Sequence, residues 1–486
     1  MNFSWSIFLD LGLICAALLI ATFIRSKVRF FQKFLIPNAL IAGFILLPFY
    51  NYAAPRLGMG NEGLENLVFH LLNLSFVAMS LRGMGTKGAG RRIFSSAVTI
   101  IIQYTLQVIV GFGLTLLFIY TFLPKLFPSF GLLMPLGYGL GPGQAFAIGK
   151  GWEVFGFEGG GNLGLVFAAL GYLWACFLGI ALITIGRRQG WMDPQLAGLI
   201  DQRRLRTGIL PLKESRPVGS LLTTETEAID TLSFNLALVL GVYLLAYLFL
   251  QLLTFLLSFA GDMGTQLANN LWGIAFIFAA VIAMFVKRIF RAFNIDHAVD
   301  NGTLTRLAGG CIDIMVTAAI AAITIVLLTR FWIPILVIAI VGAVVSTITI
   351  FWTVSRLFTD NRFTRAIMFY GNLTGTLSTG LALLRVVDPG FKTPVATDYM
   401  YGTGITFVLA IPLILMLNLP AYWYSEGKIG YLWMTLAIIG AYVLFCALSY
   451  ILLAGRRGFR NPSSLWLGEV REEATAPPVA EEVHHG

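Results

Sequence analysis

The segments LGYGLGPGQAFAIG (136–149) and YGNLTGTLSTGLALL (370–384) decide the fold of this chain. Both are apolar, but their glycines, and in the first a proline, prevent a single straight helix across a bilayer. Each lies between the fourth and fifth of five long apolar stretches, and the two sets of stretches are offset by about 235 residues. The sequence therefore predicts two related halves, each with one interrupted helix.

The composition predicts an all-α polytopic membrane protein. Of 486 residues, 57% are hydrophobic and 12% are charged, and the mean hydropathy is +0.82. Soluble proteins carry roughly 25% charged residues, and a spanning helix needs about 20 mostly apolar ones. Spans are expected near residues 5–24, 36–50, 66–81, 94–123, 161–184, 231–258, 271–286, 305–327, 331–355, 400–419 and 431–453.

The spans divide the chain into two repeats and their connectors. Because five spans are an odd number, the second repeat enters the membrane in the opposite orientation. We expect two inverted five-helix repeats, each with a re-entrant hairpin, and one extra C-terminal transmembrane helix. The predicted boundaries are 1–186 for the first repeat, 187–230 for a cytoplasmic linker, 231–420 for the inverted second repeat, 421–454 for the extra transmembrane helix and 455–486 for a polar cytoplasmic tail. Within the linker, residues 192–206 are compatible with an amphipathic surface helix.

The net charge of +9 indicates orientation, and it argues against a nucleic-acid partner. With the N-terminus outside, nearly all Lys and Arg residues fall on the cytoplasmic side, as the positive-inside rule requires. The exceptions are Arg56, Lys125, Lys150, Arg330 and Lys428. This pattern predicts a multi-pass protein of the bacterial cytoplasmic membrane with a cytoplasmic C-terminus.

The run Gly139-Leu140-Gly141-Pro142-Gly143 cannot continue an α-helix. We expect a helix–break–helix hairpin here, with the second half-helix starting at Pro142 or Gly143 and its positive dipole end at mid-membrane. The second segment is expected to break at Gly371 and Gly375. The alternative is that these glycines only allow helices to pack closely. Matched positions in the two halves favour the hairpins.

The segments GYGLGPGQAF and YGNLTGTLSTGLA, together with LIPNALIAGFIL before the second span, resemble the sodium/glutamate symporter family. The resemblance covers nearly all of residues 5–420. It implies a homodimer with a mobile domain whose two hairpins form the substrate and Na⁺ sites. The chain departs from the family pattern at Leu140, Pro142 and Gln144, and also by its eleventh span and longer connector.

Candidate site residues come from the two interrupted segments and from charges near them. Asp313 lies inside an apolar span, where a carboxylate suggests cation coupling or a hydrogen-bonded structural role. Lys150 and Arg385 could bind an anion, or anchor the hairpin ends beside Glu153 and Asp388. The expected cation ligands are Asp313, Asn372 and Thr374. The expected substrate contacts are Gly139, Gly141, Gly143, Gln144, Gly371, Asn372, Thr374, Gly375, Thr376, Ser378, Thr379 and Arg385. Gln103 and Gln107 are expected to link helices by hydrogen bonds.

These features predict a sodium-coupled symporter of a small organic anion, such as glutamate, another amino acid or a dicarboxylate. The alternatives are an ion channel or a proton-coupled carrier that uses the same hairpins. No nucleophile elbow, Walker loop or zinc motif points to an enzyme, and the four Cys and four His residues form no paired pattern. No organic cofactor and no metal other than Na⁺ is expected. Lipid, the anionic substrate and a second copy of the chain are the expected partners.

Overall fold

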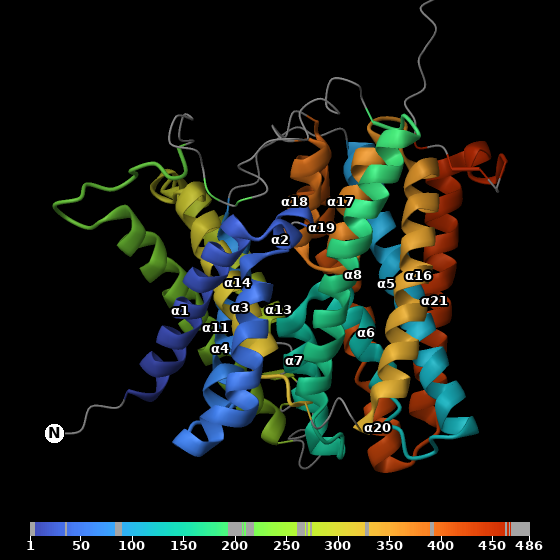
Figure 1. Ribbon diagram of the computed structural model, residues 1–486, viewed down its shortest axis with the longest axis horizontal. Helices are drawn as coiled ribbons and strands as arrows, with labels where there is room; N and C mark the ends of the chain where they lie inside the picture. The colour runs from blue at the N-terminus through green and yellow to red at the C-terminus, as the bar shows by residue number, and fades with distance from the viewer. Residues whose placement is uncertain are drawn as a thin grey trace, which may run out of the picture.

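A computed structural model describes residues 5–34, 36–82, 90–192, 218–259, 271–272, 275–325, 330–388 and 393–461, together with 207, 209, 268, 464, 465 and 467. Every regular element within these residues is helical (Figure 1). The described part of the predicted linker is short, and residues 193–206 and the tail beyond 467 lie outside the described residues. The repeat boundaries therefore stay predictions.

Nine helical segments of the described chain are long and apolar enough to cross a membrane, against eleven expected spans. The two that fall short are the second span of each half. The first of them, α3, has only 11 α-helical residues. After Pro48 the chain continues as a π-helix (Phe49–Ala53) and then as a 3-10 helix (Ala54–Leu57). The other, α13, carries Lys287, Arg288 and Arg291 in its last turns. The protein is a multi-pass, all-helical membrane protein.

The principal helices are α1 (Ser6–Lys27), α2 (Arg29–Lys33), α3 (Asn38–Pro48), α4 (Glu62–Leu81), α5 (Gly90–Thr121), α6 (Leu133–Pro135), α7 (Pro142–Gly151), α8 (Gly160–Arg188), α11 (Thr231–Ser258), α13 (Ala275–Ala292), α14 (Asn301–Ala321), α16 (Trp332–Leu357), α17 (Arg362–Thr374), α18 (Leu377–Val387), α19 (Val395–Met416), α20 (Leu419–Glu426) and α21 (Gly430–Ala454). Two of them begin with an aspartate cap. Asp230 accepts hydrogen bonds from the backbone of α11, and Asp300 does so at the start of α14. Such caps satisfy N–H groups that the helix leaves free.

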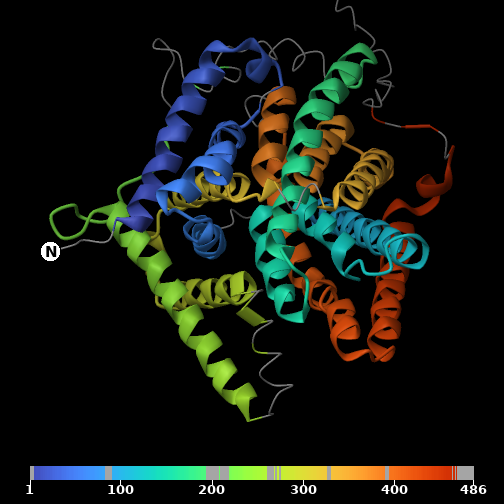
Figure 2. The same ribbon diagram turned by 60° about the horizontal axis from the view of Figure 1, so that its bottom comes forward.

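The helices pack in two groups, and each group takes members from both halves of the sequence (Figures 1 and 2). The first helix group consists of α1, α3, α4, α11, α13 and α14. The second helix group consists of α5 to α8 and α16 to α21. The first three spans of each predicted repeat therefore pack together, and the last two spans of each repeat pack together with the interrupted segments.

The two groups meet mainly where α4 and α14 pack against α7, with a smaller contact between α14 and α8. Leu72 of α4 and Met315 of α14 lie against Gly143 of α7, where an added Cβ would approach them to 2.7 and 2.9 Å. The short helix α2 also reaches across, because the rings of Phe30 and Phe34 pack on Phe177 of α8. Helix α7, which contains the second part of the first interrupted segment, therefore forms part of the boundary between the two groups.

Candidate functional site

The first interrupted segment breaks at one residue, Gly141. The chain from Phe130 to Leu140 is helical and changes from a 3-10 helix through one α-helical turn to a π-helix. Gly141 then takes φ +107° and ψ 178°, a conformation that L side chains rarely adopt. The next helix, α7, starts at Pro142, so the predicted start of the second half-helix is confirmed. Proline fits there because the first helical N–H has no partner within the helix.

The second interrupted segment breaks at Gly375 and Thr376. Helix α17 ends at Thr374, and α18 starts at Leu377 after Thr376 in an extended conformation. The predicted break at Gly371 is wrong, because this residue stays inside α17. Its lack of a side chain serves packing instead, since an added Cβ would lie 2.8 Å from the Cα of Gly380 on α18. The two arms of this segment pack against each other through that contact.

The two breaks meet inside the protein. An added Cβ on Gly141 would lie 3.0 Å from the Thr376 methyl group, so the backbone of one break touches the side chain of the other. Helix α8 runs beside both, and its Gly171 packs against the carbonyl of Thr374 and the ring of Tyr138. The first turns of α7 and α18 therefore start close together. Helix N-termini carry free N–H groups and partial positive charge, which suit an anion.

Helix α5 holds both interrupted segments in place. Its Tyr104 hydroxyl donates to the carbonyl of Gly139 at 3.3 Å. Its Gln107 amide donates to the carbonyl of Leu373 at 2.8 Å and to the Ser346 hydroxyl on α16 at 2.9 Å. Gln103 also links α5 to α16, because it accepts a hydrogen bond from Thr349 at 2.9 Å. The predicted interhelical role of the two glutamines is confirmed.

We expect Gln107→Leu to lower the free energy of unfolding by about 1–3 kcal/mol. The substitution removes the donor to Leu373 and leaves a buried carbonyl and the Ser346 hydroxyl with fewer partners. Thermal unfolding in detergent measures the loss. The matched control is Gln251→Leu on α11, where the glutamine is exposed and bonds only an exposed tyrosine, Tyr247. Equal melting temperatures for the two variants would contradict the structural role of Gln107.

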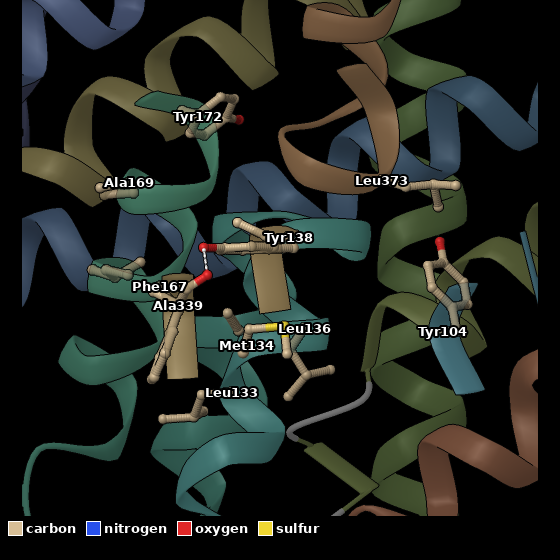
Figure 3. Close-up of a cluster of buried hydrophobic side chains, with 14 of the residues drawn as sticks. Tyr104, Leu133, Met134, Leu136, Tyr138, Phe167, Ala169, Tyr172, Ala339 and Leu373 are labelled. Carbon is tan, nitrogen blue, oxygen red and sulfur yellow. Dashed lines mark hydrogen bonds between the residues drawn. The ribbon is translucent and has the colours of Figure 1, made fainter. Parts of the chain in front are cut away.

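Two tyrosines within the interrupted segments anchor these segments to neighbouring helices. Tyr138 donates to the carbonyl of Ala339 on α16 at 2.9 Å, as the dashed line in Figure 3 shows. Tyr370 of α17 donates to the carbonyl of Trp174 on α8 at 2.9 Å. Sequence analysis did not single out these tyrosines. An apolar span that contains a tyrosine gives a weak signal, because the ring also packs as a hydrophobic side chain.

Several predicted contact residues lie at or near the breaks, but their polar groups point in different directions. The Asn372 amide donates to the Tyr399 hydroxyl, and the Thr374 hydroxyl donates to its own helix at the carbonyl of Tyr370. Gln144 is buried in the first turn of α7, where an added Cβ on Gly141 would lie 3.6 Å from its Oε1 atom. The side chain of Ser378 lies outside the described residues.

Three buried polar atoms near the breaks have no hydrogen-bond partner among the described residues. They are the Thr379 hydroxyl, the Tyr172 hydroxyl and the Oε1 atom of Gln107. Thr379 lies on α18 one turn after the break, close to Gly375. Buried polar groups are normally paired, so each unpaired atom near the breaks is a candidate contact for a ligand or water.

Two of the predicted charged residues, Asp313 and Arg385, lie on different helices. Asp313 is exposed on α14, and its charge interacts electrostatically with Tyr172 of α8. Arg385 is exposed near the end of α18. The described residues contain no group of three or more His, Cys, Asp or Glu that could hold a metal ion. An Na⁺ ion would instead need carbonyl, hydroxyl and single carboxylate oxygens.

Lys150, at the end of α7, forms ion pairs with Glu153 at 3.1 Å and with Glu65 of α4 at 3.2 Å. Burial opposes its charge, but the hydrogen bond from Lys150 to Glu153 and the charges of both acids raise its pKa. The expected pair with Glu153 is present. The additional pair with Glu65 joins α7 to the first helix group.

A buried ion cluster, which sequence analysis missed, ties together the starts of α5, α17 and α19. Arg365 is fully buried and contacts Asp360 and Asp398 at 2.8 Å each, while Arg92 contacts Asp398 at 3.0 Å. Asp360 lies before α17, and burial opposes its ionisation, but Arg365 and Arg92 outweigh that effect and lower its pKa. Its ionised form therefore stabilises the fold above pH about 3.8, and this stabilisation is lost as the pH falls through the lowered pKa.

No family model matches this chain, and searches of curated proteins and of solved structures find no match either.

Proposed function

We propose that this protein is a sodium-coupled secondary transporter, a symporter that carries a small organic anion such as glutamate, another amino acid or a dicarboxylate. One observation carries the proposal: two interrupted helices, one from each half of the chain, meet at their breaks, with Gly141 against Thr376. Broken helices at corresponding positions of two halves are typical of binding sites in secondary transporters. The resemblance of the same segments to sodium/glutamate symporters supports this class.

The anion would bind at the N-terminal ends of α7 and α18. Gly143 and Gln144 lie in the first turn of α7, and Ser378 and Thr379 lie in the first turn of α18. Backbone N–H groups at these positions have no helical partner, and they can donate to a carboxylate. The same helix ends carry partial positive charge, which favours an anion over a neutral ligand.

The cation would bind to oxygen atoms beside the anion. The breaks free backbone carbonyl groups, and Asp313 supplies a carboxylate that interacts electrostatically with Tyr172. Asn372 and Thr374 remain candidate ligands, although both side chains hydrogen-bond to protein groups in this structure. A carboxylate beside the anion site disfavours binding of the anion alone. Cation binding removes this repulsion, and that is a physical basis for coupling.

Alternating access would come from movement of the second helix group against the first. The interrupted segments belong to the second group, and few elements of the first group touch them. The Lys150–Glu65 pair and the packing of Leu72 and Met315 on Gly143 would then re-form in each cycle. We further propose two inverted repeats with re-entrant hairpins, a homodimer, and a cytoplasmic membrane location with the N-terminus outside.

Uptake by proteoliposomes tests this proposal. Purified protein is reconstituted, and accumulation of radiolabelled L-glutamate, L-aspartate and succinate is measured under an inward Na⁺ gradient. The matched arms replace the Na⁺ gradient with a K⁺ gradient or with an inward proton gradient. We expect concentrative uptake of at least one anion only with Na⁺. Uptake with the proton gradient alone would identify a proton-coupled carrier, and ion currents far above carrier turnover would identify a channel.

A further inference from the structure

We propose that Tyr172 is a further substrate-contacting residue, whose phenolic O–H donates a hydrogen bond to the carboxylate of the transported anion. This inference rests on the proposed function, because it adds a residue to the same site. Tyr172 lies on α8, the helix that runs beside both breaks. Figure 3 shows its hydroxyl pointing away from α8, toward the segment that carries Leu373.

The first argument is burial without a partner. Tyr172 is only 2% exposed, and no hydrogen bond of normal geometry to its hydroxyl is found among the described residues, although the Thr376 side chain lies within interaction range. A buried phenol of this kind lowers the free energy of unfolding relative to a phenylalanine at the same position, because no protein group replaces the water that its hydroxyl loses on folding. A buried hydroxyl that no protein group engages can donate fully to a bound ligand.

The second argument is the contrast with neighbouring tyrosines. The other four described tyrosines around the breaks each use their hydroxyl in a protein hydrogen bond: Tyr104 with Gly139, Tyr138 with Ala339, Tyr370 with Trp174, and Tyr399 with Asn372. These four hydroxyls hold the interrupted segments in place. The Tyr172 hydroxyl has no such role, although its ring lies in the same core.

The third argument is the position of the hydroxyl. It lies beside the Thr376 side chain, immediately before the first turn of α18. The free N–H groups of that turn and the Tyr172 O–H are all donors, so together they match the several acceptor sites of a carboxylate. The Asp313 carboxylate, which interacts electrostatically with Tyr172, favours binding of an anion here only when a cation neutralises it.

Tyr172→Phe tests the inference, with Tyr138→Phe as the matched control. Both variants remove one buried oxygen atom from the same core. We expect Tyr172→Phe to raise the KM for the anion that the wild type transports by about 10- to 100-fold, since it removes a hydrogen bond to a charged group. The Na⁺ concentration that gives half-maximal uptake at saturating anion should change by less than about twofold. The melting temperature should be unchanged or higher. Tyr138→Phe should lower the melting temperature, and it should raise the KM less than Tyr172→Phe does, because its hydroxyl contacts protein and not substrate.

The outcomes separate this inference from the proposed function. If the wild type transports and Tyr172→Phe keeps its KM, Tyr172 does not contact the substrate, and the proposed function still stands. If Tyr172→Phe lowers the melting temperature as much as Tyr138→Phe does, the hydroxyl has a structural partner, and the inference is wrong. If the wild type neither transports nor is thermally stabilised by L-glutamate, L-aspartate or succinate, both proposals fail.

Discussion

Gly141→Ala is expected to reduce Na⁺-driven uptake at least about tenfold and to destabilise the protein by roughly 1–3 kcal/mol. Gly141 has φ +107° and ψ 178°, which an alanine adopts only with strain. Its added Cβ would also come within 3.0 Å of the Thr376 methyl group. The backbone angles of Gly141 must change to relieve the strain, and relief of the contact with Thr376 also moves the two breaks apart. Because the proposed site lies between them, transport should suffer more than stability.

The control for this substitution is Gly113→Ala on α5. Gly113 is an exposed helical glycine, and nothing lies within 4 Å of its added Cβ. Alanine there should be neutral or slightly stabilising, since it favours the helix. Uptake and thermal unfolding are measured for both variants at equal protein density. Normal uptake by Gly141→Ala would show that the contact between the breaks is not needed for transport.

Arg365→Met is expected to destabilise the protein by roughly 3–5 kcal/mol, because it leaves the buried Asp398 carboxylate without its closest cation. Arg365 is fully buried, and Asp398, its partner at 2.8 Å, is 1% exposed. Arg92 stays near Asp398 but is partly exposed, so it compensates incompletely. The cluster fixes the start of α17, and the loss should therefore also reduce uptake by displacing Thr376. Thermal unfolding and uptake are the two measurements.

Two further variants make this prediction sharper. Arg330→Met removes an arginine from an exposed pair with Glu158, and such surface pairs contribute about 0–1 kcal/mol. The double variant Arg365→Met with Asp398→Asn should recover part of the lost stability, because it removes the unpaired buried charge as well. A loss no larger than that of Arg330→Met would show that the cluster does not stabilise the fold.

Much of the architecture could be predicted from local sequence. Apolar stretches of about 20 residues predict membrane-spanning helices, and the run around Gly141 and Pro142 predicts an interrupted one. The interhelical role of Gln107 was also predictable, since a buried amide in an apolar span needs a partner. Gly371 shows where such reasoning stops. A glycine in an interrupted segment can mark a break or a close contact, and only the neighbouring helix decides between them.

By itself, the sequence determined that this is a multi-pass membrane protein and that a helix starts at Pro142, because hydropathy and backbone preference are properties of neighbouring residues. Only the tertiary structure decided that the first three spans of both halves pack together, and that Gly141 meets Thr376. It also decided that Arg365 is paired while the Tyr172 hydroxyl is not. The physical reason is that hydrogen bonds and ion pairs act over a few ångströms, between residues that can be far apart in the chain.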